Sequence, residues 1–140
     1  MFRLIYSSEA TRDLPMPELE RMLAQSRARN TMRDVTGVLV FVDGVFMQIL
    51  EGEREAVDAL MERIRRDERH RNLKVFHEET LAQRTFGAWR MAFVSPRAEE
   101  MATWAGLDGT TTVEETLATL RGDPGRLPRV VFHLLEAVSA

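Results

Sequence analysis

The chain has 140 residues, enough for one compact domain with its own hydrophobic core. Hydrophobic residues make up 44% and charged residues 29%, and the net charge of −3 argues against a dominant nucleic-acid or anionic-membrane partner. No cysteine is present, which excludes disulfides, thiolate metal sites and cysteine nucleophiles. There is neither a signal peptide nor a run of the ~18 apolar residues that a membrane span needs, so we expect a cytoplasmic protein.

The first half of the chain predicts a strand, a helix and a β-hairpin. Residues 2–8 are rich in β-forming side chains, and a helix is expected from Pro15 to about residue 29. Residues 35–42 form a nearly continuous apolar run, which is typical of a strand buried on both faces. Asp43-Gly44 is a two-residue turn signal, so residues 45–51 should return antiparallel.

A second helix and two further strands complete a predicted sandwich. Residues 54–67 carry an apolar stripe at helical spacing beside a heavily charged face. Residues 73–81 and 86–94 bring the number of expected strands to five. The order βαββαββ predicts an α+β, ferredoxin-like sandwich with a five-stranded mixed sheet and two helices on one face.

The last third of the chain has a different pattern, and we expect residues 96–140 to be a helical extension of a domain formed by residues 1–95. Pro96 is expected at the first position of one helix, and Thr112 with Glu115 forms a capping box for the next. The final helix should carry an apolar stripe made of Leu127, Val130, Val131, Leu134, Leu135 and Val138. Two helices on one face leave the other face of the sheet bare, so the extension should cover it.

Three polar residues stand out, and each has an ordinary structural explanation. Gln48 interrupts the apolar face of a probable central strand, where an unpaired amide would cost about 1–3 kcal/mol. It bonds either a neighbouring carbonyl or a ligand that has both donors and acceptors. Tyr6, the only tyrosine, is either a packed residue with a locally bonded hydroxyl or part of a site. Asn30 ends the first predicted helix, where asparagine often caps the C-terminus.

Two further groups of residues are weaker candidates. Trp89 and Met91 would share a face of the last strand, which core packing alone can explain. Arg63, Asp67 and His70 are spaced i, i+4 and i+7 on the second helix, where a solvated charged face is the usual explanation. The histidines have no metal-ligand spacing, and no hydrolase, phosphate-loop or dinucleotide motif is present. We therefore expect neither a metal nor an enzymatic activity.

Several segments resemble the BLUF family of blue-light sensors that use flavin. The most specific are residues 30–41 (NTMRDVTGVLVF) and 43–52 (DGVFMQILEG), and the opening strand with Tyr6-Ser7-Ser8 and residues 86–93 (FGAWRMAF) match as well. The resemblance covers about residues 1–95. It implies a non-covalently bound flavin, FAD or FMN, and photoreception in place of catalysis.

The resemblance also assigns roles to single residues. Tyr6 would donate an electron to the light-excited flavin, Gln48 would bridge Tyr6 and the ring, and Asn30 would hold the carbonyl and imide edge of the ring. Met91 and Trp89 would be alternative occupants of the space beside Gln48. The resemblance places further residues around the flavin. Leu39, Phe46 and Ile64 would be apolar walls, Ser8 would be a polar neighbour, and Arg63, Asp67 and His70 would lie toward the ribityl and phosphate tail. Light would leave the Gln48 amide rotated or tautomerised.

The signal would then pass through the strand that contains Trp89 and Met91 to the helical extension. The signal would be received by an unidentified protein partner in trans or by a second copy in a homodimer. Two other functions are considered. An acylphosphatase-like enzyme would need a glycine-rich arginine loop after the first strand, which this chain lacks. A ligand-regulated dimerisation module without a chromophore would be colourless when purified.

Overall fold

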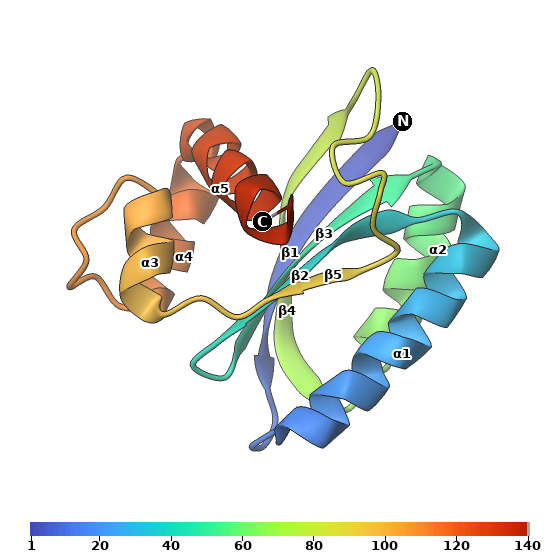
Figure 1. The fold of residues 1–140 in the computed structure, drawn as a ribbon, viewed down its shortest axis with the longest axis horizontal. Helices are drawn as coiled ribbons and strands as arrows, with labels where there is room; N and C mark the ends of the chain where they lie inside the picture. Colours follow the sequence, from blue (N-terminus) through green and yellow to red (C-terminus); the bar gives the residue numbers. More distant parts are fainter. Residues whose placement is uncertain (140) are drawn as a thin grey trace.

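The computed structural model describes residues 1–139 and contains one five-stranded sheet with helices on both faces (Figure 1). The strands are β1 (Phe2–Ala10), β2 (Thr36–Val42), β3 (Val45–Gly52), β4 (His70–Thr80) and β5 (Ala92–Val94). They lie in the order β4-β1-β3-β2-β5, and the pairings are antiparallel except for that of β2 with β5. The predicted α+β sandwich with a mixed sheet is confirmed.

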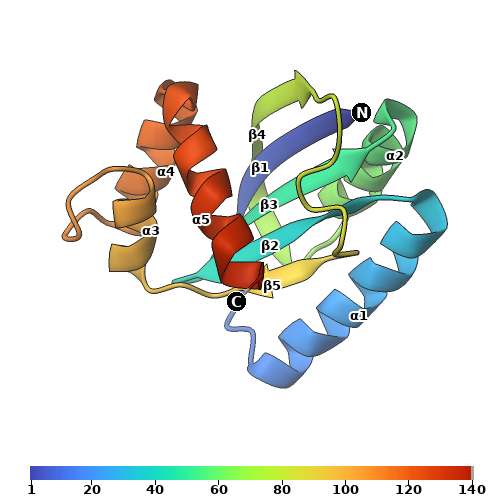
Figure 2. The same ribbon diagram turned by 45° about the horizontal axis from the view of Figure 1, so that its top comes forward.

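The helices form separate layers on the two faces of the sheet (Figures 1 and 2). One layer consists of α1 (Met16–Arg33) and α2 (Arg54–Arg65). The other consists of α3 (Ala98–Trp104), α4 (Val113–Gly122), the short 3₁₀ turn η1 (Pro124–Arg126) and α5 (Leu127–Ser139). No helix within residues 1–139 is long and apolar enough to cross a membrane.

The hairpin between β2 and β3 sets the register of the central strands. Asp43 and Gly44 adopt φ angles of 47° and 75°, as a two-residue turn of the primed type requires. With this turn in place, Leu39 of β2 lies opposite Gln48 of β3. From the other side, β1 brings Tyr6 opposite the same Gln48. Three adjacent strands therefore place these side chains in one row across the sheet.

The sheet separates two hydrophobic cores. Alternate residues of the central strands, among them Leu39 and Leu50, face α1 and α2. Their neighbours, among them Val38 and Ile49, pack against the C-terminal helices. The expected stripe on α5 is confirmed, since its buried members are Leu127, Val130, Val131 and Leu134. Because each fully buried aliphatic side chain contributes about 1.5–3 kcal/mol, this layer adds substantially to the stability of the sheet.

Several predicted boundaries were wrong. Asn30 does not cap α1, because the helix continues to Arg33 and the left-handed residue Asp34 (φ 54°) ends it. α2 ends at Arg65, so Asp67 and His70 do not lie on the helix with Arg63. Pro96 is not the first residue of α3. The helix begins at Ala98, and the preceding Arg97 N–H donates to the Glu100 carboxylate at 3.1 Å. The predicted contact of Thr112 with Glu115 is confirmed at the start of α4.

The last strand is much shorter than expected, because residues 81–91 form a loop before β5. The Trp89 N–H donates to the Phe86 carbonyl at 3.1 Å, which closes a turn where the sequence predicted continuous strand. Trp89 therefore does not share a strand face with Met91. It packs near Phe86 with the core under the C-terminal helices, while Met91 is buried on the α1–α2 side.

Candidate functional site

A cavity lies between α1 and α2, with the central strands as its floor. Tyr6, Leu39, Phe46 and Gln48 form the floor from three neighbouring strands. The walls and rim are Met22, Ser26, Arg29 and Asn30 of α1, Leu60 and Ile64 of α2, and Asp67, Arg69 and His70 after α2. The lining combines apolar side chains with converging polar groups, as small-molecule sites usually do.

Tyr6, Gln48 and Met91 form a hydrogen-bonded chain beneath this cavity. The Tyr6 hydroxyl donates to Gln48 Oε1, and Gln48 Nε2 donates to the Met91 sulfur at 3.3 Å. All three side chains are buried, with exposed fractions of 3%, 5% and 1%. A thioether is a weak acceptor, so the amide is held firmly at its oxygen end and loosely at its nitrogen end. The Gln48 amide is therefore anchored mainly by the bond that its oxygen accepts from Tyr6.

The Tyr6 hydroxyl keeps its proton. Burial raises the pKa of Tyr6 far above its ordinary value, and the negative charge of Asp67 raises it further. The neutral phenol is thus the donor in the bond to Gln48 over the whole physiological range of pH. Gln48 Oε1 is the acceptor in direct contact with this proton.

Asn30 has a hydrogen-bond acceptor that is not satisfied by the described part of the chain. Its amide nitrogen donates to the Arg90 carbonyl at 2.5 Å, while Oδ1 is buried and has no hydrogen-bond partner in the described part of the chain. Such an atom costs about 1–3 kcal/mol unless a ligand or water satisfies it. Because Asn30 lines the cavity, a ligand with an imide N–H would supply the missing donor.

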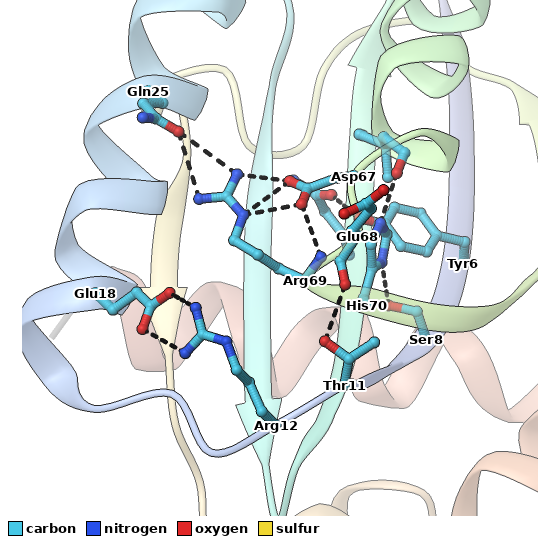
Figure 3. Close-up of polar contacts among 12 residues, drawn as sticks. Tyr6, Ser8, Thr11, Arg12, Glu18, Gln25, Asp67, Glu68, Arg69 and His70 are labelled. Carbon is cyan, nitrogen blue, oxygen red and sulfur yellow. Dashed lines mark hydrogen bonds and ion pairs between the residues drawn. The ribbon is translucent and has the colours of Figure 1, made fainter.

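His70 lies at the rim and connects β1 with α2 (Figure 3). Its Nε2 is 2.5 Å from the Ile64 carbonyl and its Nδ1 is 2.8 Å from the Ser8 hydroxyl. A carbonyl only accepts, so Nε2 carries the proton and Nδ1 accepts from Ser8. Ser8 therefore does not line the cavity itself but hydrogen-bonds His70, which does. The His70 ring also contacts Phe46 edge-on.

Positive charge gathers at the mouth of the cavity. Arg69 pairs with Asp67, with 2.9 Å between Nε and Oδ1, and lies 3.5 Å from Gln25 of α1 (Figure 3). An adjoining hollow is lined by Arg29, Arg63, Arg66, Asp67 and Arg69. Burial lowers the pKa of Arg29, and the nearby guanidinium of Arg63 lowers it further. Asp67 pairs with Arg69 and Glu62 pairs with Arg66, so these arginines still outnumber their carboxylate partners, and the mouth suits an anionic group such as a phosphate.

The structure brings most of the sequence-predicted residues to one place. Those that line the cavity are Tyr6, Asn30, Leu39, Phe46, Gln48, Ile64, Asp67 and His70. Ser8 and Met91 each lie one contact behind the lining, and Arg63 belongs to the adjoining hollow. Trp89 does not lie beside Gln48, because its loop turns it toward Phe86.

Five lining residues were not predicted from the sequence: Met22, Ser26, Arg29, Leu60 and Arg69. Helical spacing contained the signal for four of them. Met22, Ser26 and Arg29 repeat at i, i+4 and i+7, and Leu60 is one turn before Ile64. No local pattern marks Arg69, because it comes from the connection after α2. Among residues 1–139, no group of histidine, aspartate or glutamate side chains could hold a metal ion.

Comparison with known proteins agrees with this geometry. Residues 1–92 match the family described as BLUF, sensors of blue light using FAD. Subunit beta of a photoactivated adenylate cyclase from Euglena gracilis is 35% identical over 105 residues, which are 74% of this chain and 12% of that protein. This chain thus corresponds to only a small part of that relative.

Two solved structures resemble nearly the whole chain, including the C-terminal helices. BlrB, a BLUF protein in its dark state, has a TM-score of 0.78 at 26% identity and covers 97% of this chain and 96% of its own. BlsA in its photo-activated state has a TM-score of 0.80 at 30% identity, with coverage of 96% and 94%. The match to residues 1–92, together with the cavity above Tyr6 and Gln48, shows that this chain belongs to the BLUF family of blue-light sensors, which bind FAD or FMN.

Proposed function

We propose that this chain is a photoreceptor in which Tyr6, Gln48 and Met91 convert the absorption of blue light into a conformational signal. The observation that carries the proposal is the buried chain of hydrogen bonds from the Tyr6 hydroxyl through the Gln48 amide to the Met91 sulfur. It combines a proton donor, a group that can both donate and accept, and a weak acceptor that can release that group.

The residues around the cavity fit a flavin. Asn30 Oδ1 would accept from the imide N–H of the ring, and Leu39, Phe46 and Ile64 would contact its apolar surface. The arginines at the mouth would hold a phosphate, which FMN and FAD both carry. When bound, the flavin supplies the absorption of blue light and takes up an electron.

Tyr6 would supply that electron. Oxidation makes a phenol strongly acidic, and Gln48 Oε1 is the acceptor already bonded to it. With its oxygen protonated, Gln48 would become the donor in its bond to Tyr6, so the bond that fixed its dark orientation would be reversed. When the electron returns to the Tyr6 radical, the Gln48 side chain would turn and its nitrogen would give a proton back to the Tyr6 oxygen. Gln48 would then be rotated and tautomerised, with an O–H that can donate to the ring. Gln48 Nε2 would at that point no longer donate to Met91.

Residues 1–95 would form the sensor, and its output would be a rearrangement of the segment that contains Met91. Residues 96–140, the helical extension of this sensor, would transmit that rearrangement to a partner. Support comes from the placement of Phe86 and Trp89, in the same loop as Met91, against the core under the C-terminal helices. A protein partner in the cytoplasm, or a second copy in a homodimer, would receive this signal. The chain itself would turn over no substrate.

A spectroscopic experiment tests the proposal. The purified chain, supplied with FAD or FMN, should be yellow, and blue light should shift its flavin absorption slightly to the red, with full return in the dark. A stronger hydrogen bond from Gln48 to the flavin carbonyl is the expected cause of the shift. A chain that binds neither flavin, or that binds one without any reversible shift, would contradict the proposal and favour a dimerisation module without a chromophore.

A further inference from the structure

Glu51 is a fully buried carboxylate that the proposed photochemistry does not use. It lies on β3 three residues after Gln48, and the alternation of the strand places it on the opposite face of the sheet. Its two oxygens accept from four N–H groups. Oε2 accepts from the Arg3 guanidinium at 2.8 and 3.1 Å, and Oε1 from the backbone of Thr85 at 2.9 Å and of Phe86 at 2.7 Å.

These contacts tie the loop between β4 and β5 to the central sheet. Arg3 strengthens the attachment, because the same guanidinium that pairs with Glu51 donates to the Thr85 hydroxyl at 2.5 Å. The Phe86 side chain is fully buried, so the loop is held by its backbone and its side chain together. Unlike most surface loops, this one begins from a buried ionic anchor.

The other end of the loop meets the cavity. Asn30 donates to the Arg90 carbonyl at 2.5 Å, and Arg27 Nε donates to the Met91 carbonyl at 3.0 Å. The Met91 sulfur accepts from Gln48 at 3.3 Å. Met91 follows Phe86 by only five positions, and the Phe86–Trp89 turn stiffens the chain between them.

We propose that Glu51 is a positioning residue, which holds the Met91 sulfur against Gln48 through residues 85–91 and thereby sets the rate of return from the lit state. The inference rests on the proposed light-driven rotation of Gln48. A methionine side chain is flexible and fills many shapes, so its own rotamers do not keep the sulfur at one point. The fixed backbone on either side does so. Glu51 supplies the buried charged contacts of that fixation, and the more exposed Arg84 and Arg90 add pairs with Asp34 at 3.1 and 3.0 Å.

The test is a cycle of variants that measures dark recovery of the flavin spectrum after blue light. Glu51→Gln, Met91→Ala and the double variant are compared with the wild type. Glu79→Gln is the matched control, because Glu79 also pairs with Arg3, at 2.9 Å, but makes no contact with the Thr85 or Phe86 backbone. All variants are first checked for unchanged flavin binding.

Glu51→Gln should change the recovery rate about tenfold when Met91 is present and leave it unchanged in the Met91→Ala background, a coupling of ~1.4 kcal/mol. Glu79→Gln should recover at the wild-type rate. A Glu51→Gln effect of equal size with and without Met91, or one matched by Glu79→Gln, would overturn the inference, because residues that act independently have additive effects. If the wild type shows no reversible shift, it is the proposed function that fails.

A milder variant keeps the test usable if Glu51→Gln does not fold. Thr85→Val removes the bond from Arg3 to the loop and leaves the Glu51 carboxylate with all its donors. It should change the recovery rate about threefold, as expected for one hydrogen bond, and only when Met91 is present. An equal change in the Met91→Ala background would refute the positioning role by the same logic.

Discussion

Tyr6 and Gln48 lie directly opposite each other on the neighbouring antiparallel strands β1 and β3, and the tyrosine hydroxyl donates to the glutamine side-chain oxygen. Backbone pairing therefore places the donor and the acceptor, and neither depends on a flexible loop for its position. A buried bond of this kind is rigid enough to give one dark state. In the proposed function, the weak contact of Gln48 with Met91 on the other side lets the amide leave that state.

Replacing Tyr6 with phenylalanine should leave flavin bound and abolish the reversible red shift. Phenylalanine preserves the packing on β1 but removes the only proton that Gln48 Oε1 accepts, and stability should fall by about 1 kcal/mol. Light-minus-dark absorption spectra and urea unfolding measure the two effects. Trp104→Phe, on the far side of the sheet, serves as the control and should keep the full shift. A Tyr6→Phe protein with a normal photocycle would show that Tyr6 is not the donor.

Gln48→Leu should fold and bind flavin, because leucine fits the neighbouring apolar residues Leu39 and Phe46. It leaves the Tyr6 hydroxyl without its acceptor, at a cost of about 1–3 kcal/mol. The ordinary light-induced shift should disappear, which absorption spectroscopy under blue light would measure. Retention of the full shift with wild-type kinetics would exclude the amide as the switch.

Alkaline pH should reveal the burial of Tyr6. The pKa of Tyr6 is raised above its ordinary value of 10.0, so near neutral pH both the folded and the unfolded chain hold the proton and this group adds no pH dependence. Above pH 10.0 the unfolded chain loses the proton first, and the free energy of unfolding should fall by up to about 1.4 kcal/mol per pH unit.

Because Tyr6 is the only tyrosine, the ultraviolet absorbance of tyrosinate reports on it alone. The folded protein should show no tyrosinate at a pH where the urea-unfolded chain is fully ionised. Tyr6→Phe supplies the matched control for stability and should lack this component of the alkaline slope. Ionisation near the ordinary pKa in the folded protein would mean that Tyr6 is accessible to water.

Arg63→Gln should weaken FMN about tenfold while leaving riboflavin unchanged, because a charged hydrogen bond to phosphate is lost and the ring contacts remain. Arg65→Gln is the control, since Arg65 lies on the same helix but does not line the hollow at the mouth. Titrations followed by flavin fluorescence would measure both affinities. An equal loss for riboflavin and FMN would place Arg63 at the ring or show that it acts through folding.

Deletion of residues 96–140 should expose the apolar sheet face that includes Val38, Val40 and Ile49. A patch larger than a few hundred Å² is rarely tolerated by soluble monomers, so we expect aggregation or a changed oligomeric state. The cavity proposed to hold the flavin lies on the other face and should survive. Size-exclusion chromatography with flavin absorbance distinguishes these results, and a soluble monomeric truncation would contradict the expectation.

Elements with local patterns were predictable from the amino-acid sequence. Strand alternation placed Gln48 on an otherwise apolar face, Asp43-Gly44 predicted the hairpin that sets its register, and helical periodicity identified the face of α5 that covers the sheet. These features depend on residues only a few positions apart, so they can be read without knowing the fold.

The contacts between residues of different elements could not be predicted in this way. The loop that turns Trp89 away and brings Met91 to Gln48 is held by Glu51, which is 34 and 35 residues away from the two amides that it binds. Arg69 reaches the cavity mouth from an irregular connection. Such contacts join segments that are far apart in the sequence and share no periodic pattern. Their buried hydrogen bonds contribute to stability only after the sheet has formed.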